Sequence, residues 1–196
     1  MAPRKKVTKK RERKTSFREE ITKELSPEEK KLIKITVADV FSLINAFLGF
    51  FAIVAIIRFE NGYTIAAFAM ILGVIFDFLD GKVARYRNEC GEFGKNIDSF
   101  ADVITFGVAP AFFLSQFLTG IIVFVPFLIV LGGIYRLARF NLINAGNYFM
   151  GMPITCNGLI IPVLYLSGVV TAEVAVLASM VIFILMVSTL KIKKFI

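Results

Sequence analysis

Four aspartates recur at helical spacing within an apolar stretch of the sequence. Asp77 and Asp80 are three residues apart, and Asp98 and Asp102 are four apart, in FDFLDGKVARYRNECGEFGKNIDSFADVITF. Residues at these spacings share one face of a helix, so each pair presents its two carboxylates on the same side. A carboxylate near the centre of a membrane costs about 2.5–3.5 kcal/mol, and four together would also repel one another. The arrangement therefore predicts a compensating cation.

The residue types that are missing narrow the chemistry of this site. The sequence has no histidine, and its two cysteines, Cys90 and Cys156, are far apart. This excludes a histidine general base, an HExxH zinc site and a Ser–His–Asp triad, and it argues against a cysteine metal pair or a disulfide framework. Four carboxylates make an all-oxygen site that suits Mg²⁺, Mn²⁺ or Ca²⁺, and two divalent cations would neutralise it.

Small and basic residues accompany the aspartates on the same faces. Gly81 and Ala84 leave room for a flat or bulky group to approach the backbone. Arg85 adds a forked donor suited to phosphate, and Gly94 lies one turn before Asp98. The alternative is that the aspartates mark solvated helix ends, but Asp98 and Asp102 enter an apolar helix in phase. The set therefore favours binding of a nucleotide diphosphate, with chemistry at phosphorus.

The elements that carry these residues are predicted to be membrane spans. Hydrophobic residues make up 57% of the chain and the mean hydropathy is +0.73, whereas a soluble domain is about 45–50% apolar. A soluble enzyme, a disulfide scaffold and a disordered protein are excluded. About 20 apolar residues cross a bilayer, so we expect an all-α, polytopic fold with six transmembrane helices: 36–57, 63–85, 94–118, 121–141, 153–170 and 172–190.

The N-terminal region differs sharply in composition from the rest. Of the 23 Lys and Arg residues, 13 fall in the first 34 positions. Without interleaved aromatic residues or a nucleic-acid-binding module, this basic tail is expected to bind anionic lipid headgroups and no nucleic acid. Ser26 and Glu29 form a capping-box pattern that starts a short amphipathic helix on the membrane. The predicted regions are a disordered tail (1–25), an interfacial helix (26–35), the six-helix domain (36–190) and a basic C-terminus (191–196).

The distribution of basic residues predicts the orientation in the membrane. In a six-span arrangement the basic residues gather with the tail on one side, and the opposite side carries only Arg58. The positive-inside rule then places both termini in the cytoplasm. No small-residue cleavage site follows the first span, so a cleaved signal peptide is not expected. The residues on the side of the tail are Arg85, Arg87, Arg136, Arg139 and the final lysines.

The spacing of the aspartate stretch is similar to a known signature. It resembles, without a substitution, the eight-position pattern of the CDP-alcohol phosphotransferases, and the resemblance extends over 36–190. It implies an integral-membrane enzyme, usually a homodimer, that moves a phosphatidyl or similar group from a CDP-linked donor to an alcohol and releases CMP. The pattern in this chain is Asp77-x2-Asp80-Gly81-x2-Ala84-Arg85-x8-Gly94-x3-Asp98-x3-Asp102.

The same resemblance implies roles for individual residues. All four aspartates would hold the two metal ions, and Asp102 would also act as the general base. The CDP-linked lipid would be bound with Gly81 and Ala84 along the cytidine and Arg85 near the phosphates. The other expected contacts to the donor are Asp77, Gly94 and Asn45.

Two further stretches resemble one branch of this family. Arg136-Leu137-Ala138-Arg139-Phe140-Asn141, followed by Phe149-Met150-Gly151-Met152-Pro153, is similar to the RxARFN…FxGLP stretch of bacterial and archaeal phosphatidylserine synthases. Ser42-Leu43-Ile44-Asn45 with Gly49 is similar to their TxxN…G pattern in the first span. Met152 and Ser42 depart from the usual leucine and threonine. The resemblance implies L-serine as acceptor, CDP-diacylglycerol or CDP-archaeol as donor, and a prokaryotic cytoplasmic membrane with the active site facing the cytoplasm.

Several alternatives remain open at this level. Arg136, Arg139 and Asn141 are expected to bind serine, although the two arginines would also suit a cytoplasmic interface. Asn45 is either a buried interhelical hydrogen bond or a contact to cytidine. The acceptor could instead be glycerol phosphate or inositol phosphate, which should need a denser basic cluster. A divalent-cation transporter would more naturally show broken helices or inverted repeats, and neither is visible.

Overall fold

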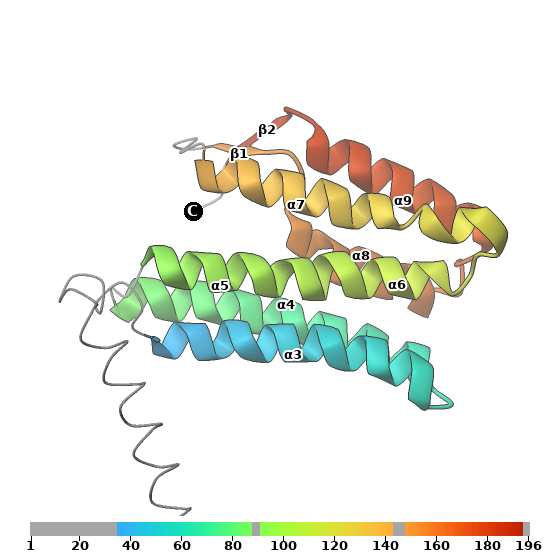
Figure 1. The fold of residues 1–196 in the computed structure, drawn as a ribbon, viewed down its shortest axis with the longest axis horizontal. Coiled ribbons are helices and arrows are strands. Elements are labelled where there is room, and N and C mark those ends of the chain that lie inside the picture. Colours follow the sequence, from blue (N-terminus) through green and yellow to red (C-terminus); the bar gives the residue numbers. More distant parts are fainter. Residues whose placement is uncertain (1–34, 88–90, 143–147, 194–196) are drawn as a thin grey trace, which may run out of the picture.

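The computed structural model describes residues 35–87, 91–142 and 148–193. Of the expected regions, the tail 1–25, all but the last residue of the interfacial helix 26–35, and the last three residues of the basic C-terminus lie outside the described residues. The described chain is helical apart from one short β-ribbon. Its helices run roughly side by side in a bundle (Figure 1).

The first described helix, α3 (Val37–Arg58), begins with a capping box. The backbone N–H of Thr36 donates to Asp39 Oδ2 at 2.6 Å, and the backbone N–H of Asp39 donates to Thr36 Oγ1 at 3.3 Å. This reciprocal pair satisfies two N–H groups that a helix start leaves without partners. After a short turn, α4 (Gly62–Arg87) runs back alongside α3 (Figure 1).

The third long helix is continuous but changes its winding directly after Asp102. It consists of α5 (Glu92–Asp102), the π-helical segment η1 (Val103–Val108) and α6 (Ala109–Ser115). Side chains bridge η1 to its neighbours: Thr105 Oγ1 donates to the carbonyl of Asn45 at 2.7 Å, and Asn157 Nδ2 donates to the carbonyl of Phe106 at 2.8 Å. Single π turns within α-helices are frequent at functional sites.

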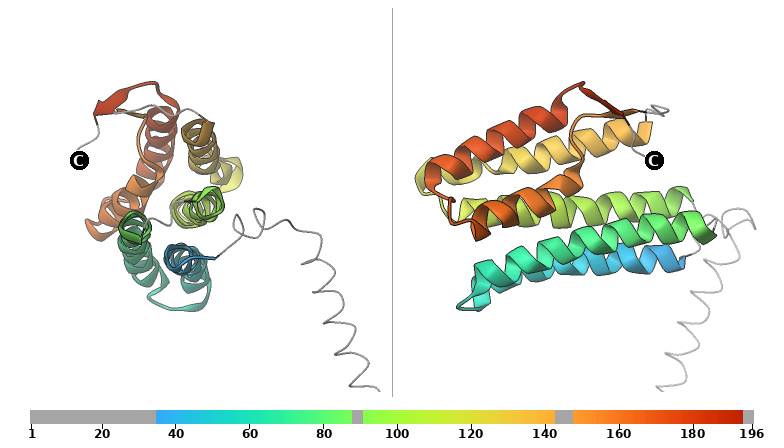
Figure 2. Two further views of the ribbon diagram at one scale, coloured as in Figure 1. Left: turned by 90° about the vertical axis from the view of Figure 1, so that its left-hand side faces the viewer. Right: turned by 180° about the vertical axis from the view of Figure 1, so that it is seen from behind.

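The second half of the chain covers the other side of this helix (Figure 2). The strands β1 and β2 pair antiparallel, with Phe149 opposite Ile192. This ribbon was not predicted, because its two strands are separated by some forty residues and only the tertiary fold brings them together. The elements are η2 (Gly120–Phe124), α7 (Phe127–Leu142), β1 (Tyr148–Met150), η3 (Ile154–Cys156), α8 (Asn157–Leu166), α9 (Ala172–Val187) and β2 (Lys191–Lys193).

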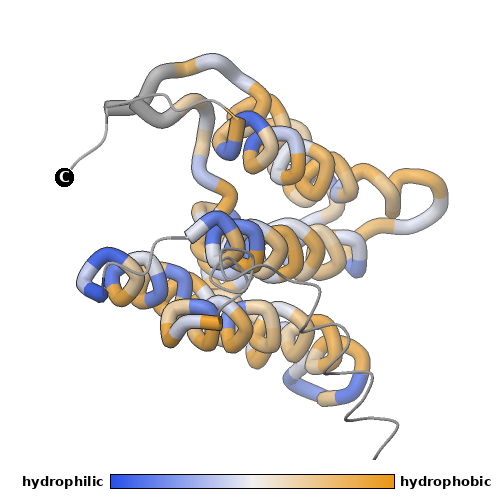
Figure 3. The backbone as a smooth tube through the Cα atoms, turned by 60° about the vertical axis from the view of Figure 1, so that its left-hand side comes forward, coloured by the Kyte–Doolittle hydropathy of each residue, from blue (hydrophilic) through white to orange (hydrophobic). Residues whose placement is uncertain are grey.

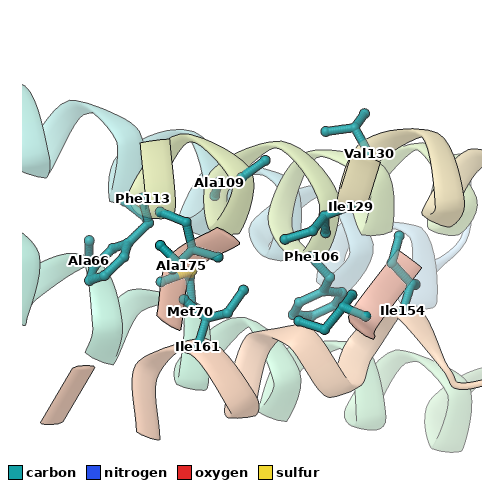
Figure 4. Close-up of a cluster of buried hydrophobic side chains, with 14 of the residues drawn as sticks. Ala66, Met70, Phe106, Ala109, Phe113, Ile129, Val130, Ile154, Ile161 and Ala175 are labelled. Carbon is teal, nitrogen blue, oxygen red and sulfur yellow. The ribbon is translucent and has the colours of Figure 1, made fainter. Parts of the chain in front are cut away.

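The apolar core lies around the third long helix, between the first two helices and the second half of the chain (Figure 4). Phe106 and Phe113 of the third long helix are fully buried, as are Met70 of α4, Ile129 of α7 and Ile161 of α8. Between membrane-spanning helices, such side chains stabilise the fold through close van der Waals packing rather than through removal from water. This core fixes the third long helix against α4, α7 and α8, so the aspartates carried by α4 and α5 are held on a packed framework.

Four of the six expected spans are confirmed as helices of sufficient length and hydropathy among the described residues: Val37–Arg58, Gly62–Arg87, Glu92–Ser115 and Gly120–Leu142. The expected spans 153–170 and 172–190 correspond to shorter apolar helices, Ile154–Leu166 and Ala172–Val187. The apolar stretches follow the lengths of the helices, and hydrophilic residues concentrate near their ends (Figure 3). The chain is therefore a membrane protein, while six crossings and the cytoplasmic placement of both termini stay predictions.

Candidate active site

Three of the four expected aspartates converge between two helices. Asp77 of α4 and Asp98 and Asp102 of α5 each offer a carboxylate oxygen, and these oxygens lie within 4.8 Å of one another. Asp102 is buried, and its carboxylate lies next to that of Asp77. Like charges this close need a cation or a shared proton. The predicted convergence of carboxylates from two helices is confirmed for these three.

The residues present fit a divalent cation at this cluster. All the donors are oxygens, which Mg²⁺, Mn²⁺ and Ca²⁺ prefer. Asp98 Oδ1 is buried and has no hydrogen-bond partner among the described residues, so a ligand to this oxygen would satisfy a polar atom that the protein leaves unpaired. The cluster Asp77, Asp98 and Asp102 is called the triad below.

Asp80 lies beside the triad rather than within it. Its buried carboxylate accepts a 2.8 Å hydrogen bond at Oδ2 from Ser42 Oγ of α3. Ser42 was singled out in sequence only as part of a family-like pattern, and the structure gives it a specific partner. Asp80 as a further metal ligand stays a prediction.

A cavity of about 380 Å³ opens next to these carboxylates. Three of the residues expected to bind the donor line it, namely Gly81, Ala84 and Gly94, whereas Asn45, Asp77 and Arg85 are not among its lining residues. A Cβ added at Gly81 would meet nothing within 4 Å, so packing within the protein does not explain this glycine. The cavity is lined by Ala38, Asp39, Ser42, Asp80, Gly81, Ala84, Gly91, Glu92, Gly94, Lys95 and Asp98.

Two contacts were expected as alternatives for Asn45, an interhelical hydrogen bond and a contact to cytidine. Its Nδ2 donates to Asp102 Oδ1 at 3.5 Å, and its Oδ1 is buried without a hydrogen-bond partner among the described residues. The interhelical hydrogen bond is thus present. It depends on a close approach of α3 to η1, because a Cβ added at Gly49 would come within 2.6 Å of Thr105 Cα.

The two arginines of α7 differ in their surroundings. Arg136 is only 7% exposed, interacts electrostatically with Asp102 and Asp77, and keeps a buried Nε without a hydrogen-bond partner. The guanidinium also lies over the Phe140 ring, with Cζ 5.7 Å from the ring centroid, so Nε is a buried donor whose hydrogen-bonding capacity the described residues leave unused. Arg136 therefore lies beside the triad, as expected of a residue that would bind an acceptor.

Arg139, in contrast, is bonded to the backbone. Its Nη1 donates to the carbonyl of Val187 at 3.1 Å, and its Nη2 donates to Met150 at 3.0 Å, Ser188 at 3.0 Å and Met186 at 3.3 Å. These bonds tie α7 to the end of β1 and to the end of α9. The structure thus surrounds Arg139 with protein acceptors, and binding of serine by its remaining N–H groups stays a prediction. Asn141 Nδ2 donates to Ser99 Oγ at 3.2 Å and leaves its buried Oδ1 unpaired among the described residues.

Two polar residues near the site were missed at the sequence level. Asp39 lines the cavity, and Asn157 is fully buried against η1. The signal for Asp39 was its spacing, because Asp39, Ser42 and Asn45 recur every third residue and share one face of α3. For Asn157 the signal was an amide at the start of an apolar segment, and sequence alone names no partner for it.

Comparison with known proteins agrees with this geometry. The family described as CDP-alcohol phosphatidyltransferase matches residues 35–190. The chain is 37% identical over 163 residues to an archaetidylserine synthase of Methanothermobacter thermautotrophicus, covering 80% of this chain and 69% of that protein. It is 41% identical over 133 residues to a CDP-diacylglycerol–serine O-phosphatidyltransferase of Saccharomyces cerevisiae, covering 59% of this chain and 48% of that protein.

A bacterial relative shows the same pattern of partial coverage. A CDP-diacylglycerol–serine O-phosphatidyltransferase of Helicobacter pylori is 35% identical over 130 residues, covering 63% of this chain and 54% of that protein. The chain thus spans between about half and two thirds of the length of these relatives. The matched region contains the triad, the cavity and the two arginines of α7, and the chain belongs to the CDP-alcohol phosphatidyltransferase family.

Proposed function

We propose that this chain transfers the phosphatidyl or archaetidyl group of a CDP-linked lipid to the hydroxyl of L-serine, forming phosphatidylserine or its ether-lipid counterpart and releasing CMP. The observation that carries this proposal is the triad of carboxylates beside a cavity lined by Gly81, Ala84 and Gly94. Such a cavity suits a nucleotide whose diphosphate reaches the carboxylate end. The names of the relatives support serine as the acceptor.

The triad and Asp80 would hold the metal ions in this proposal. Two divalent cations, Mg²⁺ or Mn²⁺, with Ca²⁺ also suited to oxygen ligands, would supply positive charge beside the diphosphate and the departing CMP. Ser42 would keep Asp80 in place through its 2.8 Å hydrogen bond. Arg85 is exposed near the end of α4, where it would meet the phosphates from the open side.

Asp102 is proposed as the proton acceptor. The serine hydroxyl gives its proton to the Asp102 carboxylate, and the serine oxygen forms a bond to the phosphorus that carries the lipid. The bond between that phosphorus and the bridging oxygen then breaks, and CMP leaves with the electron pair. Asn45, which donates to Asp102 Oδ1, would keep the carboxylate oriented for this step.

Arg136 is proposed as the main contact of the serine carboxylate. It is buried beside Asp102, which supports placing the serine hydroxyl and the serine carboxylate on neighbouring protein groups. A guanidinium binds a carboxylate through two parallel hydrogen bonds. Arg139 and Asn141 complete the proposed serine contacts, and the backbone bonds of Arg139 would also hold this part of the site together.

The proposed setting is a prokaryotic cytoplasmic membrane with six crossings and both termini inside. The start of α3, the end of α4, the start of α5 and the end of α7 lie at one end of the bundle (Figure 1), and the basic residues near these ends support a cytoplasmic site. A homodimer and binding of the basic tail to anionic headgroups complete the proposal.

An assay of CMP release tests the function directly. Purified protein in detergent receives CDP-diacylglycerol or CDP-archaeol, Mn²⁺ or Mg²⁺, and one of L-serine, glycerol phosphate or inositol phosphate. We expect CMP release with serine, and the Asp98→Asn variant serves as the inactive control. Release only with a phosphorylated alcohol would replace serine as the acceptor. Divalent-cation flux into liposomes without any CMP release would support a transporter instead.

A further inference from the structure

Asp39 is a buried carboxylate that the proposed reaction does not use. It lies in the first turn of α3, is only 2% exposed and lines the cavity, but it does not belong to the triad. Its Oδ2 accepts the hydrogen bond from the N–H of Thr36. Among the described residues, none donates a hydrogen bond to its Oδ1. A buried carboxylate keeps capacity for more than one donor, so Oδ1 is an acceptor still available to a ligand.

The other polar side chains that line the cavity are already hydrogen-bonded, belong to the proposed metal site, carry only donors, or are exposed to solvent. Ser42 Oγ donates its hydrogen bond to Asp80, and Asp80 and Asp98 belong to the proposed metal site. Lys95 carries only donors, and Glu92 is exposed to solvent at the start of α5. Among the described lining residues, Asp39 is therefore the buried anionic acceptor that lies outside the proposed metal site.

The position of Asp39 corresponds to the nucleoside part of a bound nucleotide. Its Oδ1 lies against Gly94, since a Cβ added at Gly94 would come within 2.7 Å of this oxygen. Gly94 precedes Asp98 by four residues, which is about 6 Å along a helix. With its diphosphate at Asp98, a nucleotide could lie along α5 with its nucleoside near Gly94 and Asp39, and the absence of a Cβ at Gly94 lets the Asp39 carboxylate pack close to α5 at this end of the cavity.

We propose that Asp39 selects the nucleotide of the donor by accepting a hydrogen bond at Oδ1 from the cytidine. This rests on the proposed use of a CDP-linked lipid. Cytidine has two donors that related nucleosides lack, the amino group of the base, absent from uridine, and the 2′-hydroxyl of the ribose, absent from deoxycytidine. Carboxylates accept hydrogen bonds from both kinds of group in other proteins. The hydrogen bond would make the first turn of α3 part of the donor site.

Binding of three nucleotides to two proteins tests this inference. The affinities of CMP, UMP and dCMP are measured by calorimetry, with Mn²⁺ present, for the full chain and for Asp39→Asn. Asparagine retains an oxygen for the N–H of Thr36 but presents an amide N–H₂ to the cavity. Because a hydrogen bond to a charged group is lost, we expect CMP affinity to fall about 10-fold or more. The nucleotide that lacks the donor bound by Asp39 should lose little, which identifies that donor.

Controls separate this role from capping of the helix. Thr36→Ala removes the other half of the capping box, and it should lower thermal stability while leaving the ratio of CMP to UMP and dCMP affinities unchanged. If Asp39→Asn folds poorly, Asp39→Ser is a second uncharged variant. It should lose CMP affinity in the same way as expected for Asp39→Asn. Equal losses for all three nucleotides, or no loss for any, would overturn the inference. If the wild-type chain itself does not bind CMP, the proposed function fails first.

Discussion

Asn45 Nδ2 of α3 donates a hydrogen bond of 3.5 Å to Asp102 Oδ1 of α5, which joins the first described helix to the deepest carboxylate of the triad. The bond is buried. A second bond joins the same two helices, because the backbone carbonyl of Asn45 accepts a hydrogen bond from Thr105 Oγ1 of η1. The contact with Asn45 Nδ2 favours one orientation of the Asp102 carboxylate before any ligand binds. Asn45 acts on the triad from a helix that carries none of its members.

Replacing Asn45 separates the two roles that it was expected to have. In Asn45→Ala, Asp102 loses its hydrogen bond from Nδ2, which at 3.5 Å in this structure would have to shorten when substrate binds to contribute the about 1.5–3 kcal/mol of a bond to a charged group. We expect kcat to fall about 10–100-fold while the KM for the CDP-linked lipid changes little. Steady-state kinetics with L-serine in excess measure both. A raised KM with unchanged kcat would instead make Asn45 a contact of the donor.

Helical periodicity accounts for the parts of the site that were predicted from sequence. Residues three and four apart share a helix face, so the convergence of Asp77, Asp98 and Asp102 followed from spacing once two helices were expected to face each other. Helical spacing likewise placed Gly81 and Ala84 on one face, and both line the cavity, whereas a donor contact at Gly94 was implied by the family resemblance. These relationships are local in sequence, and each depends on the geometry of a single helix.

Relationships between distant segments were not predictable in the same way. Arg139 bonds to carbonyls 47 to 49 residues away, at the end of α9, and a guanidinium can reach many alternative partners. The β-ribbon likewise pairs strands that only the tertiary fold brings together. Asp39 was missed because an acidic residue in the first turn of a helix is ordinary, and its contact with Gly94 depends on how α3 and α5 pack.

Gly81→Ala should make the protein more stable and less active. A Cβ at this position meets nothing within 4 Å, and alanine in a helix interior is about 0.5–1 kcal/mol more favourable than glycine. The added methyl group enters the cavity, so we expect a higher KM for the CDP-linked lipid. Thermal unfolding and donor titration test the two effects separately. Gly49→Ala is the matched control, and it should destabilise the chain because its Cβ would collide with Thr105. An unchanged KM in Gly81→Ala would mean that the CDP-linked lipid does not bind against Gly81.

The triad and Asp80 should differ in their effect on metal binding. Asp98 belongs to the triad, whereas Asp80 is held by Ser42 beside it. Asp98→Asn should weaken Mn²⁺ binding strongly, and Asp80→Asn should weaken it less but still lower activity, because one anionic oxygen ligand is lost in each. Titration of Mn²⁺ followed by electron paramagnetic resonance measures binding without turnover. Wild-type Mn²⁺ affinity in both variants would contradict metal binding by these carboxylates.

The two arginines of α7 should respond differently to replacement by lysine, which keeps the charge and removes the fork. Arg136→Lys should raise the KM for serine and lower thermal stability less than Arg139→Lys does, because the buried Nε of Arg136 has no hydrogen-bond partner among the described residues. Arg139→Lys should chiefly lower the thermal stability, because several backbone carbonyls would lose a donor. Serine kinetics and thermal unfolding of both variants decide the matter. A raised serine KM in folded Arg139→Lys would confirm a direct contact of Arg139 with the acceptor.

Asp102→Asn should strongly lower turnover while sparing binding of the CDP-linked lipid more than Asp77→Asn does. A carboxylate next to a cation has a lowered proton affinity and is a weak base on its own. It can still accept the serine proton as charge develops on the hydroxyl oxygen during attack, and the hydrogen bond from Asn45 to its Oδ1 keeps it oriented. Loss of a general base lowers rates about 10²–10⁴-fold. Donor binding and the turnover rate, measured on both variants, separate the two roles of Asp102. Equal loss of donor binding in both variants would make Asp102 a metal ligand only, and water would then have to accept the proton of the serine hydroxyl.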